Sequence, residues 1–313
     1  MNNVRTMGRD AFSPLLAVLA VLLWVGPATG AEAQGTPAPS AAAQPKAAAP
    51  AKAAVPAKAK PSRKPADAGF KLILEPRAME LLKAVSDRLA AAKTLQFTAV
   101  AGYEYPSKLG PPILYSVRYE VVMQRPDKLR ILMPGDGPAS EFYVDGRQMV
   151  AYAPNENLAA FADAPPTVEA ALLAAFKTAG IYFPFVDLLA ADPYKALTEG
   201  AELAFVVGPS TVVGGVKTDM VVWANPDVFL QIWIGSDDKL PRRVRAIFRN
   251  DPLGLRHELD LSDWKLDAPV PQDFFVPAKA QSAGRMPFKS PGPPAKAMKP
   301  LAAGKPAVPA KSK

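Results

Sequence analysis

The sequence predicts an α+β domain in which an antiparallel β-sheet of about eleven strands is wrapped over a few helices. Many short segments alternate apolar and polar residues, which is typical of antiparallel strands with one face toward a core. The helical segments gather in two places instead of following each strand, and this arrangement excludes a βαβ fold. Hydrophobic residues make up 49% of the chain, so a core of useful size can be buried.

The first predicted element is a helix over residues 75–93. Pro76 suits its first position, where a backbone N–H would have no helical partner. We expect one face to pack against the sheet, because it carries an apolar stripe at helical spacing: Met79, Leu82, Val85 and Leu89.

Two long strands are predicted next, at residues 95–105 and 113–123, with a turn around Gly110 between them. An Asp145-Gly146 turn joins two of the shorter strands that follow. These shorter strands are expected at 128–133, 140–144, 148–153, 158–162, 202–207, 217–224, 228–235, 242–249 and 255–266.

A helical insertion interrupts the strands. Thr167 is suited to cap a helix over residues 168–179, and Gly180 is suited to end it. A second helical stretch is expected at 184–197, with a break at Asp192-Pro193.

The first 33 residues have the three-part pattern of a Sec-type signal peptide. Arg5 and Arg9 precede an apolar run at 15–25, and small residues follow. The run is about eleven residues long, whereas a membrane-spanning helix needs about twenty. We therefore expect export to the periplasm with cleavage near residue 33, and an uncleaved anchor is the alternative.

Two basic, proline-rich segments flank the predicted domain, which spans residues 67–278. Residues 34–66 and 279–313 consist mainly of Ala, Pro and Lys, contain no acidic residue, and are expected to be disordered. The net charge of +8 therefore comes from these segments, because acidic residues outnumber basic ones between them. The segments either bind anionic surfaces of the cell envelope or serve only as spacers. Nucleic acid is not an expected partner of an exported chain.

The composition argues against several classes of enzyme and metal site. The chain has no cysteine, so it has no disulfide, thiolate nucleophile or Cys-ligated zinc. Its one histidine, His257, alternates with leucines and is expected to be a core or rim residue. No G-x-S-x-G, H-E-x-x-H, P-loop or dinucleotide-binding motif is present. We expect no enzymatic activity, no metal and no cofactor.

Three segments, in this order, resemble the bacterial lipoprotein-localisation carriers of the LolA/LolB-like superfamily. The resemblance covers about residues 66–278 and points to an uncharacterised periplasmic branch of that superfamily rather than to LolA itself. The chain lacks the lipidated cysteine of LolB-type receptors, and the basic tails are not part of the carrier pattern. The three segments are 125–130 (Arg-Pro and a short strand), 144–152 (a strand-turn-strand with Asp-Gly) and 240–244, which is followed by 251–254 and 274–275.

The resemblance implies an incomplete antiparallel β-barrel of about eleven strands, closed by helices around an apolar cavity. In LolA this cavity holds the acyl chains of a lipoprotein. The arginine of the family's Arg-Pro motif helps to hold the helical lid, and Arg125 matches it. The resemblance therefore predicts that Arg125 is a lid latch. The alternative is that Arg125 is an ordinary surface arginine. We expect Arg125→Leu to fold nearly as the natural chain does and to alter ligand release.

The strand alternation gives ten candidate ligand-binding residues on the inward faces of the strands. Two functions fit them: a periplasmic carrier of a lipid, lipoprotein or other apolar ligand, or an envelope sensor or scaffold that binds another protein. A core packed solid by the protein's own side chains counts strongly against the carrier and leaves the second function. The ten residues are Phe97, Tyr103, Tyr115, Tyr119, Met123, Met133, Phe142, Met220, Ile232 and Ile234.

Overall fold

The computed structural model describes residues 73–290, except 109, 136 and 137. The expected signal peptide, the 34–66 segment and the tail beyond residue 290 lie outside the described residues.

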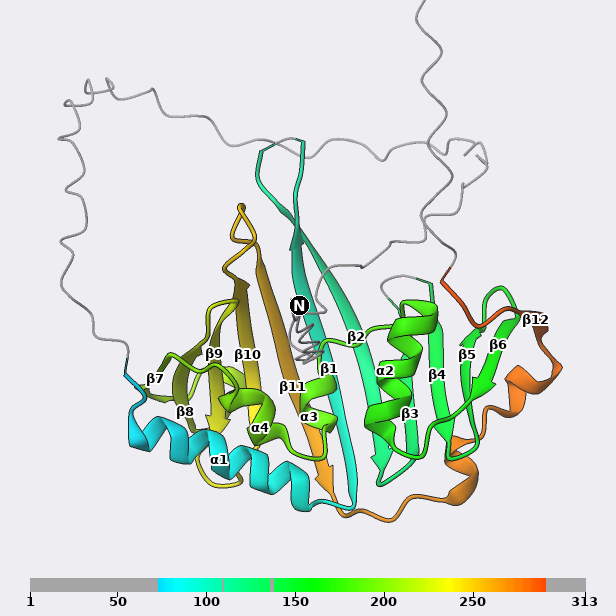
Figure 1. Cartoon of the computed structure of the whole chain (residues 1–313), viewed down its shortest axis with the longest axis horizontal. Coiled ribbons are helices and arrows are strands. Elements are labelled where there is room, and N and C mark those ends of the chain that lie inside the picture. Colours follow the sequence, from blue (N-terminus) through cyan, green and yellow to red (C-terminus); the bar gives the residue numbers. More distant parts are fainter. Residues whose placement is uncertain (1–72, 109, 136–137, 291–313) are drawn as a thin grey trace, which may run out of the picture. The chain divides into compact units, whose positions relative to one another are not determined.

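The described part of the chain contains one open sheet of twelve strands (Figure 1). Its order is β12-β6-β5-β4-β3-β2-β1-β11-β10-β9-β8-β7, and all neighbours are antiparallel except β12 and β6. The mostly antiparallel sheet with few helices confirms the predicted class. The strands are β1 (Thr94–Tyr105), β2 (Ile113–Gln124), β3 (Lys128–Met133), β4 (Ser140–Asp145), β5 (Gln148–Ala153), β6 (Leu158–Asp163), β7 (Leu203–Ser210), β8 (Thr218–Ala224), β9 (Val228–Gly235), β10 (Pro241–Phe248), β11 (Arg256–Leu266) and β12 (Gly284–Met286).

Four α-helices lie on one face of the sheet, which we call the inner face (Figure 1). Thr167 caps α2 by accepting a hydrogen bond from the N–H of Ala170 at 3.2 Å, and Gly180 ends it in the left-handed conformation. The predicted break at Asp192-Pro193 separates α3 from α4. The helices are α1 (Pro76–Ala91), α2 (Val168–Ala179), α3 (Val186–Leu189) and α4 (Pro193–Thr198).

The main core lies between the helices and the inner face. The predicted stripe of α1 is buried there, with Leu82 and Leu89 at 1% and 0% exposure. Alternate residues of the central strands meet it, because successive side chains of a strand point to opposite faces. Leu259 and Leu261 of β11 belong to this core, whereas their neighbours Glu258 and Asp260 point to the outer face.

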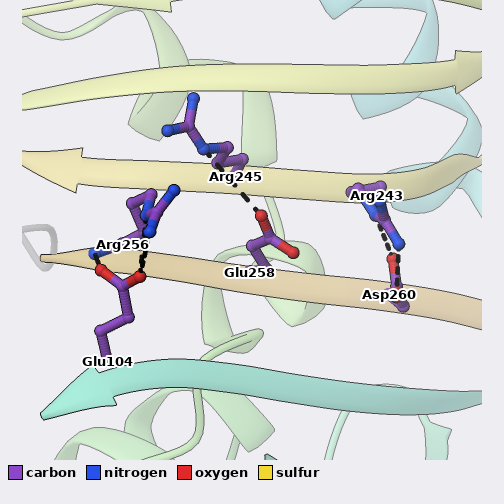
Figure 2. A network of polar contacts seen from close by, with 6 residues as sticks. All are labelled: Glu104, Arg243, Arg245, Arg256, Glu258 and Asp260. Carbon is purple, nitrogen blue, oxygen red and sulfur yellow. Dashed lines mark hydrogen bonds and ion pairs between the residues drawn. The ribbon is translucent and has the colours of Figure 1, made fainter. Parts of the chain in front are cut away.

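The outer face of the central strands carries a set of ion pairs that we call the charge ladder (Figure 2). The two pairs between β10 and β11 join residues that lie opposite one another in the sheet, and the third lies just beyond the end of the β1–β11 pairing. β11 takes part in all of them, with β10 on one side and β1 on the other. The pairs are Arg243–Asp260 at 2.5 Å, Arg245–Glu258 at 4.0 Å and Glu104–Arg256 at 2.5 Å.

The prediction that a disordered tail begins at residue 279 is wrong for the first twelve residues. Two 3-10 turns, η3 (Gln272–Phe275) and η4 (Ala278–Ser282), lead into β12, which pairs in parallel with β6. Ala280 and Ala283 are buried against Tyr143 and Tyr152 on the outer face. The composition of this segment resembles the tail, but small residues suit close packing on a sheet. The domain therefore extends past 278, and the strand count is twelve.

Candidate binding site on the inner face

The inner face of the β1–β2 hairpin changes from closed to open along its length. The inner residues pair across the two strands, from Leu95 opposite Met123 to Tyr105 opposite Ile113. Leu95 and Met123 are fully buried, whereas Tyr105 and Ile113 are each 47% exposed. A single apolar surface therefore runs from the core to solvent without a polar break on this face.

Two phenylalanines occupy the inner face beneath the helices. Phe183 and Phe185 lie in the segment between α2 and α3, and each is 1% exposed. Phe185 contacts Phe97 at 5.5 Å and Tyr119 at 5.2 Å between ring centroids, and Phe183 contacts Phe142 at 5.5 Å. The protein's own rings thus fill the space where the resemblance implied a cavity. Periodicity could not reveal these residues, because they lie in neither a strand nor a helix.

The ten candidate residues divide into three groups. Tyr103 and Met133 are half-buried, and Tyr115 is 38% exposed. Placing Met220 on the inner face was wrong, because it pairs with Trp233 on the outer face, beside Gln231. The continuous apolar run of β8 gave no alternation from which to assign its faces. The other six are buried in the main core: Phe97, Tyr119, Met123, Phe142, Ile232 and Ile234.

The open end of the inner face carries a group that we call the aromatic shelf. Tyr115 stacks on Tyr103 at 5.7 Å and meets Tyr105 edge-on at 6.3 Å. His257 lies opposite Tyr103 in the sheet register and contacts Phe248 at 5.2 Å. Tyr105 belongs to the predicted alternation, so the sequence carried the signal that would have added it to the candidates. The shelf consists of Tyr103, Tyr105, Ile113, Tyr115, Phe248 and His257.

Burial shifts the titration of several groups around the shelf. It raises the pKa of Tyr103, and it raises the pKa of Tyr119 to about 12. Burial lowers the pKa of His257, which favours the neutral imidazole. Burial also raises the pKa of Asp187 in α3, and both burial and the nearby Asp187 carboxylate raise the pKa of Tyr182. Tyr103 and Tyr119 are therefore neutral, and the uncharged form of His257 is favoured beside Tyr103.

Arg125 connects the end of β2 to two helices. Its Nε donates to the carbonyl of Ala92, and Nη2 donates to that of Leu89 at the end of α1. Nη1 donates to Leu189 O at 3.3 Å, and Nη2 donates to Ala190 O at 3.0 Å at the end of α3. Four carbonyl oxygens at helix ends, which lack helical partners, are thus satisfied by one guanidinium.

The α2–α4 region, residues 168–198, forms what we call the helical cover. Besides the contacts of Arg125 with α3, the N–H of Val168 donates to the carbonyl of Pro126 at 2.8 Å. The side chain of Arg125 and the carbonyl of Pro126 therefore both connect the helical cover to the β2–β3 turn. The resemblance pointed to Arg125, and these hydrogen bonds show which groups it joins. Its role as a lid latch stays a prediction.

A surface depression of about 390 Å³ lies on the outer face, away from the shelf. Arg130 stacks over the ring of Phe274 at 4.0 Å, and Tyr143 donates a hydrogen bond to Glu141 at 2.6 Å. Asp273 and Val276 complete part of its wall. The depression is formed where η3 crosses β3 and β4, so it belongs to the packing of the C-terminal segment.

Within residues 73–290, no group of three or more His, Cys, Asp or Glu side chains is placed to hold a metal ion. The same residues include no helix that is long and apolar enough to cross a membrane.

The chain belongs to a family described as "Predicted periplasmic protein (DUF2092)", whose profile matches residues 78–289. The description of this family agrees with the periplasmic assignment expected from the sequence. A comparison with curated proteins found no match.

Several solved structures are similar to this chain. The lipoprotein LppX of Mycobacterium tuberculosis is 14% identical, with a TM-score of 0.41 over 64% of this chain and 100% of LppX. LprF of Mycobacterium bovis is 16% identical, with a TM-score of 0.40 over 63% and 96% of the two chains. A LolA superfamily protein of Nitrosomonas europaea is 12% identical, with a TM-score of 0.31 over 64% and 97%.

Proposed function

We propose that this protein is a non-enzymatic periplasmic protein that binds an apolar chain, such as an acyl chain of a lipid or lipoprotein, against the inner face of its sheet. The periplasmic location agrees with the description of its family and with the predicted signal peptide. The basic segments outside the domain would act either as spacers or as contacts to anionic envelope surfaces.

The observation that carries the proposal is the continuity of the inner face of the hairpin. Apolar side chains run from Leu95, which is fully buried, to Tyr105, which is 47% exposed. An acyl chain on this surface would be removed from water at about 0.8 kcal/mol per methylene. The shelf is its entry, and a longer chain requires Phe183 and Phe185 to move aside.

The helical cover would be the movable lid, and Arg125 its latch. The cover contacts the sheet through Phe183 and Phe185 and through the buried face of α2, and α3 is only four residues long. Arg125 gives up two hydrogen bonds if α3 moves, to Leu189 and Ala190, while those to α1 can remain. Hydrogen bonds from a charged donor contribute about 1.5–3 kcal/mol each. A ligand must offset this cost to hold the lid open.

The proposal is tested with the mature chain purified from a bacterial periplasm. Solvent extraction followed by mass spectrometry should recover stoichiometric lipid, and N-phenyl-1-naphthylamine should fluoresce on the delipidated protein. The variant Tyr115→Ser should bind this probe about fivefold more weakly, because part of an aromatic contact is lost. Val212→Ser is the matched control, since Val212 is 87% exposed and lies in the β7–β8 connection. A lipid-free protein on which both variants bind the probe equally would refute ligand binding at the shelf.

A sensor or scaffold function is the second candidate, and the packing of Phe183 and Phe185 favours it. With the inner face filled, binding would use an exterior surface. A stable protein partner recovered by crosslinking in envelope extracts, with no lipid bound, would favour this function over the first.

A further inference from the structure

The β1–β2 hairpin extends beyond the neighbouring strands as a two-stranded projection (Figure 1). The pairing of β1 with β11 stops at Tyr103 opposite His257, and the pairing of β2 with β3 begins only at Glu120. Beyond these points the two strands pair only with each other. An isolated two-stranded hairpin is marginally stable in water, so this projection depends on its surroundings.

The end of the projection is apolar on both faces. Tyr105, Ile113 and Tyr115 are 47%, 47% and 38% exposed on the inner face. Leu114 is 65% exposed on the outer face, where it lies opposite Glu104. The strands of a solvated hairpin alternate apolar with polar residues, and Leu114 breaks this alternation at the end of β2. The exposed apolar residues of the projection therefore suggest an apolar contact on two sides at once.

Charges mark where this apolar end begins. The sequence from Tyr105 to Val117 contains one charged residue, Lys108, which is exposed near the turn. The next charged residues toward the body are Glu104 and Arg118, and each forms an ion pair, with Arg256 and Glu120 respectively. The boundary is staggered, because Glu104 lies opposite Leu114 whereas Arg118 lies opposite Val100, four residues nearer the body of the sheet.

We propose that this projection docks the protein on a lipid bilayer, with Ile113 and the turn in the headgroup region, Leu114 at its boundary beside the Glu104–Arg256 ion pair, and the Arg118–Glu120 ion pair in water. From Glu104 the strand reaches the turn in three or four residues, or about 10–13 Å. Interfacial segments reach about 5–10 Å into the headgroup and acyl boundary, which is comparable. Tyrosines suit this depth, and Lys108 complements the phosphates of the headgroups.

A bilayer fits better than a peptide or a flat protein surface. A peptide strand added to the free edge of β2 would pair with the backbone and leave both apolar faces in water. A flat partner would cover only one face. The unpaired backbone of the two edges limits the docking to the hydrated headgroup region, because such groups cannot enter the hydrocarbon. The contact is with the headgroup surface of the bilayer, and it does not require a ligand on the inner face of the sheet.

Flotation with phosphatidylcholine vesicles tests the proposal on the full mature chain. Neutral lipid excludes a contribution from the lysine-rich tails, whose binding requires anionic headgroups. The chain should float with the vesicles, and Leu114→Ser should bind at least fivefold more weakly while retaining its melting temperature. Leu114 is on the outer face and outside the shelf, so ligand binding by this variant should be unchanged. Val212→Ser should float as the natural chain does, because Val212 is at the opposite end of the strands.

A fluorescent label gives a second readout of which end meets the lipid. The chain contains no cysteine, so a single one can carry an environment-sensitive dye. The dye on Pro111→Cys should shift to the blue with vesicles, whereas the dye on Val212→Cys should not. Equal responses at the two positions, or flotation of Leu114→Ser equal to that of the natural chain, would overturn the proposal. So would a response of the Pro111→Cys dye to envelope proteins but not to vesicles.

Discussion

The inner and outer faces of the central strands are stabilised in different ways. On the inner face of β10, β11 and β1, alternate residues such as Leu259 and Leu261 enter a core shared with the helices. On the outer face, the residues between them form the charge ladder, in which each charge faces an opposite one across a strand boundary (Figure 2). The inner face is held by burial, whereas the outer face needs only to pair its charges in water. Stability should therefore depend strongly on the inner side chains and weakly on the outer ones.

The largest effect is expected from Phe185→Ala. The side chain is 1% exposed and contacts Phe97 and Tyr119, so truncation leaves a cavity in the inner core. We expect a loss of about 3–5 kcal/mol in the free energy of unfolding, measured by denaturant titration. Phe229→Ala on the outer face of β9 is the matched control and should cost clearly less, because Phe229 is only partly buried. Equal losses would show that the two faces do not differ as proposed.

A smaller effect is expected from Arg125→Leu. Its guanidinium serves four carbonyl oxygens, and the variant leaves them without this donor. We expect a loss of about 2–3 kcal/mol, so the sequence-based expectation of nearly unchanged folding is replaced by a moderate destabilisation. Arg125→Lys keeps the charge but not the four-way geometry, and should recover only part of the loss.

Ligand release separates a latch from a purely structural arginine. If Arg125 holds the lid, the dissociation rate of a bound apolar probe should rise in Arg125→Leu, as measured by stopped-flow fluorescence. A destabilised variant with an unchanged dissociation rate would contradict the latch.

Asp187→Asn should stabilise the protein slightly at pH 7. Burial raises the pKa of Asp187, so the folded state holds its proton more tightly than the unfolded state does. The stability from this residue is present below the ordinary carboxyl pKa and is lost as the pH rises through the higher folded pKa. Asparagine removes the buried charge, and we expect a gain on the order of 1 kcal/mol at pH 7. Melting curves of both proteins should converge near pH 4, and a constant difference at all pH values would contradict this origin.

The smallest effect is expected from the charge ladder. Arg243 and Asp260 are 33% and 45% exposed as side chains, so water and salt screen their attraction. Arg243→Ala should reduce the free energy of unfolding by less than about 1 kcal/mol, and the difference should shrink in 0.5 M salt. A large, salt-independent loss would mean that the outer face contributes more than paired surface charges.

The strands and the helix ends could be predicted from the sequence, because the patterns that mark them are local. Alternation along β1 and β2 located both strands and their inner faces, and Thr167 and Gly180 marked the two ends of α2. The Arg-Pro motif identified Arg125, although its four acceptors come from distant parts of the chain and could not be read from it.

The features that sequence analysis missed depend on tertiary packing. Phe183 and Phe185 have no strand or helix period, so only the folded contacts reveal that they fill the inner face. β12 has three residues inside a segment with a tail-like composition. Met220 lies in a run that is apolar at almost every position, and such a run does not distinguish two faces. In each case the deciding partner is far away in sequence.

The pairing of β12 with β6 has a practical consequence for where this domain ends. Without residues 284–286, the backbone of β6 would offer a bare strand edge, and Phe161 would lose the guanidinium of Arg285 that stacks over it at 3.7 Å. Exposed edges recruit strands from other molecules. A chain shortened to residue 278 would therefore tend to self-associate. A chain that ends at residue 290 keeps the edge of β6 paired with β12.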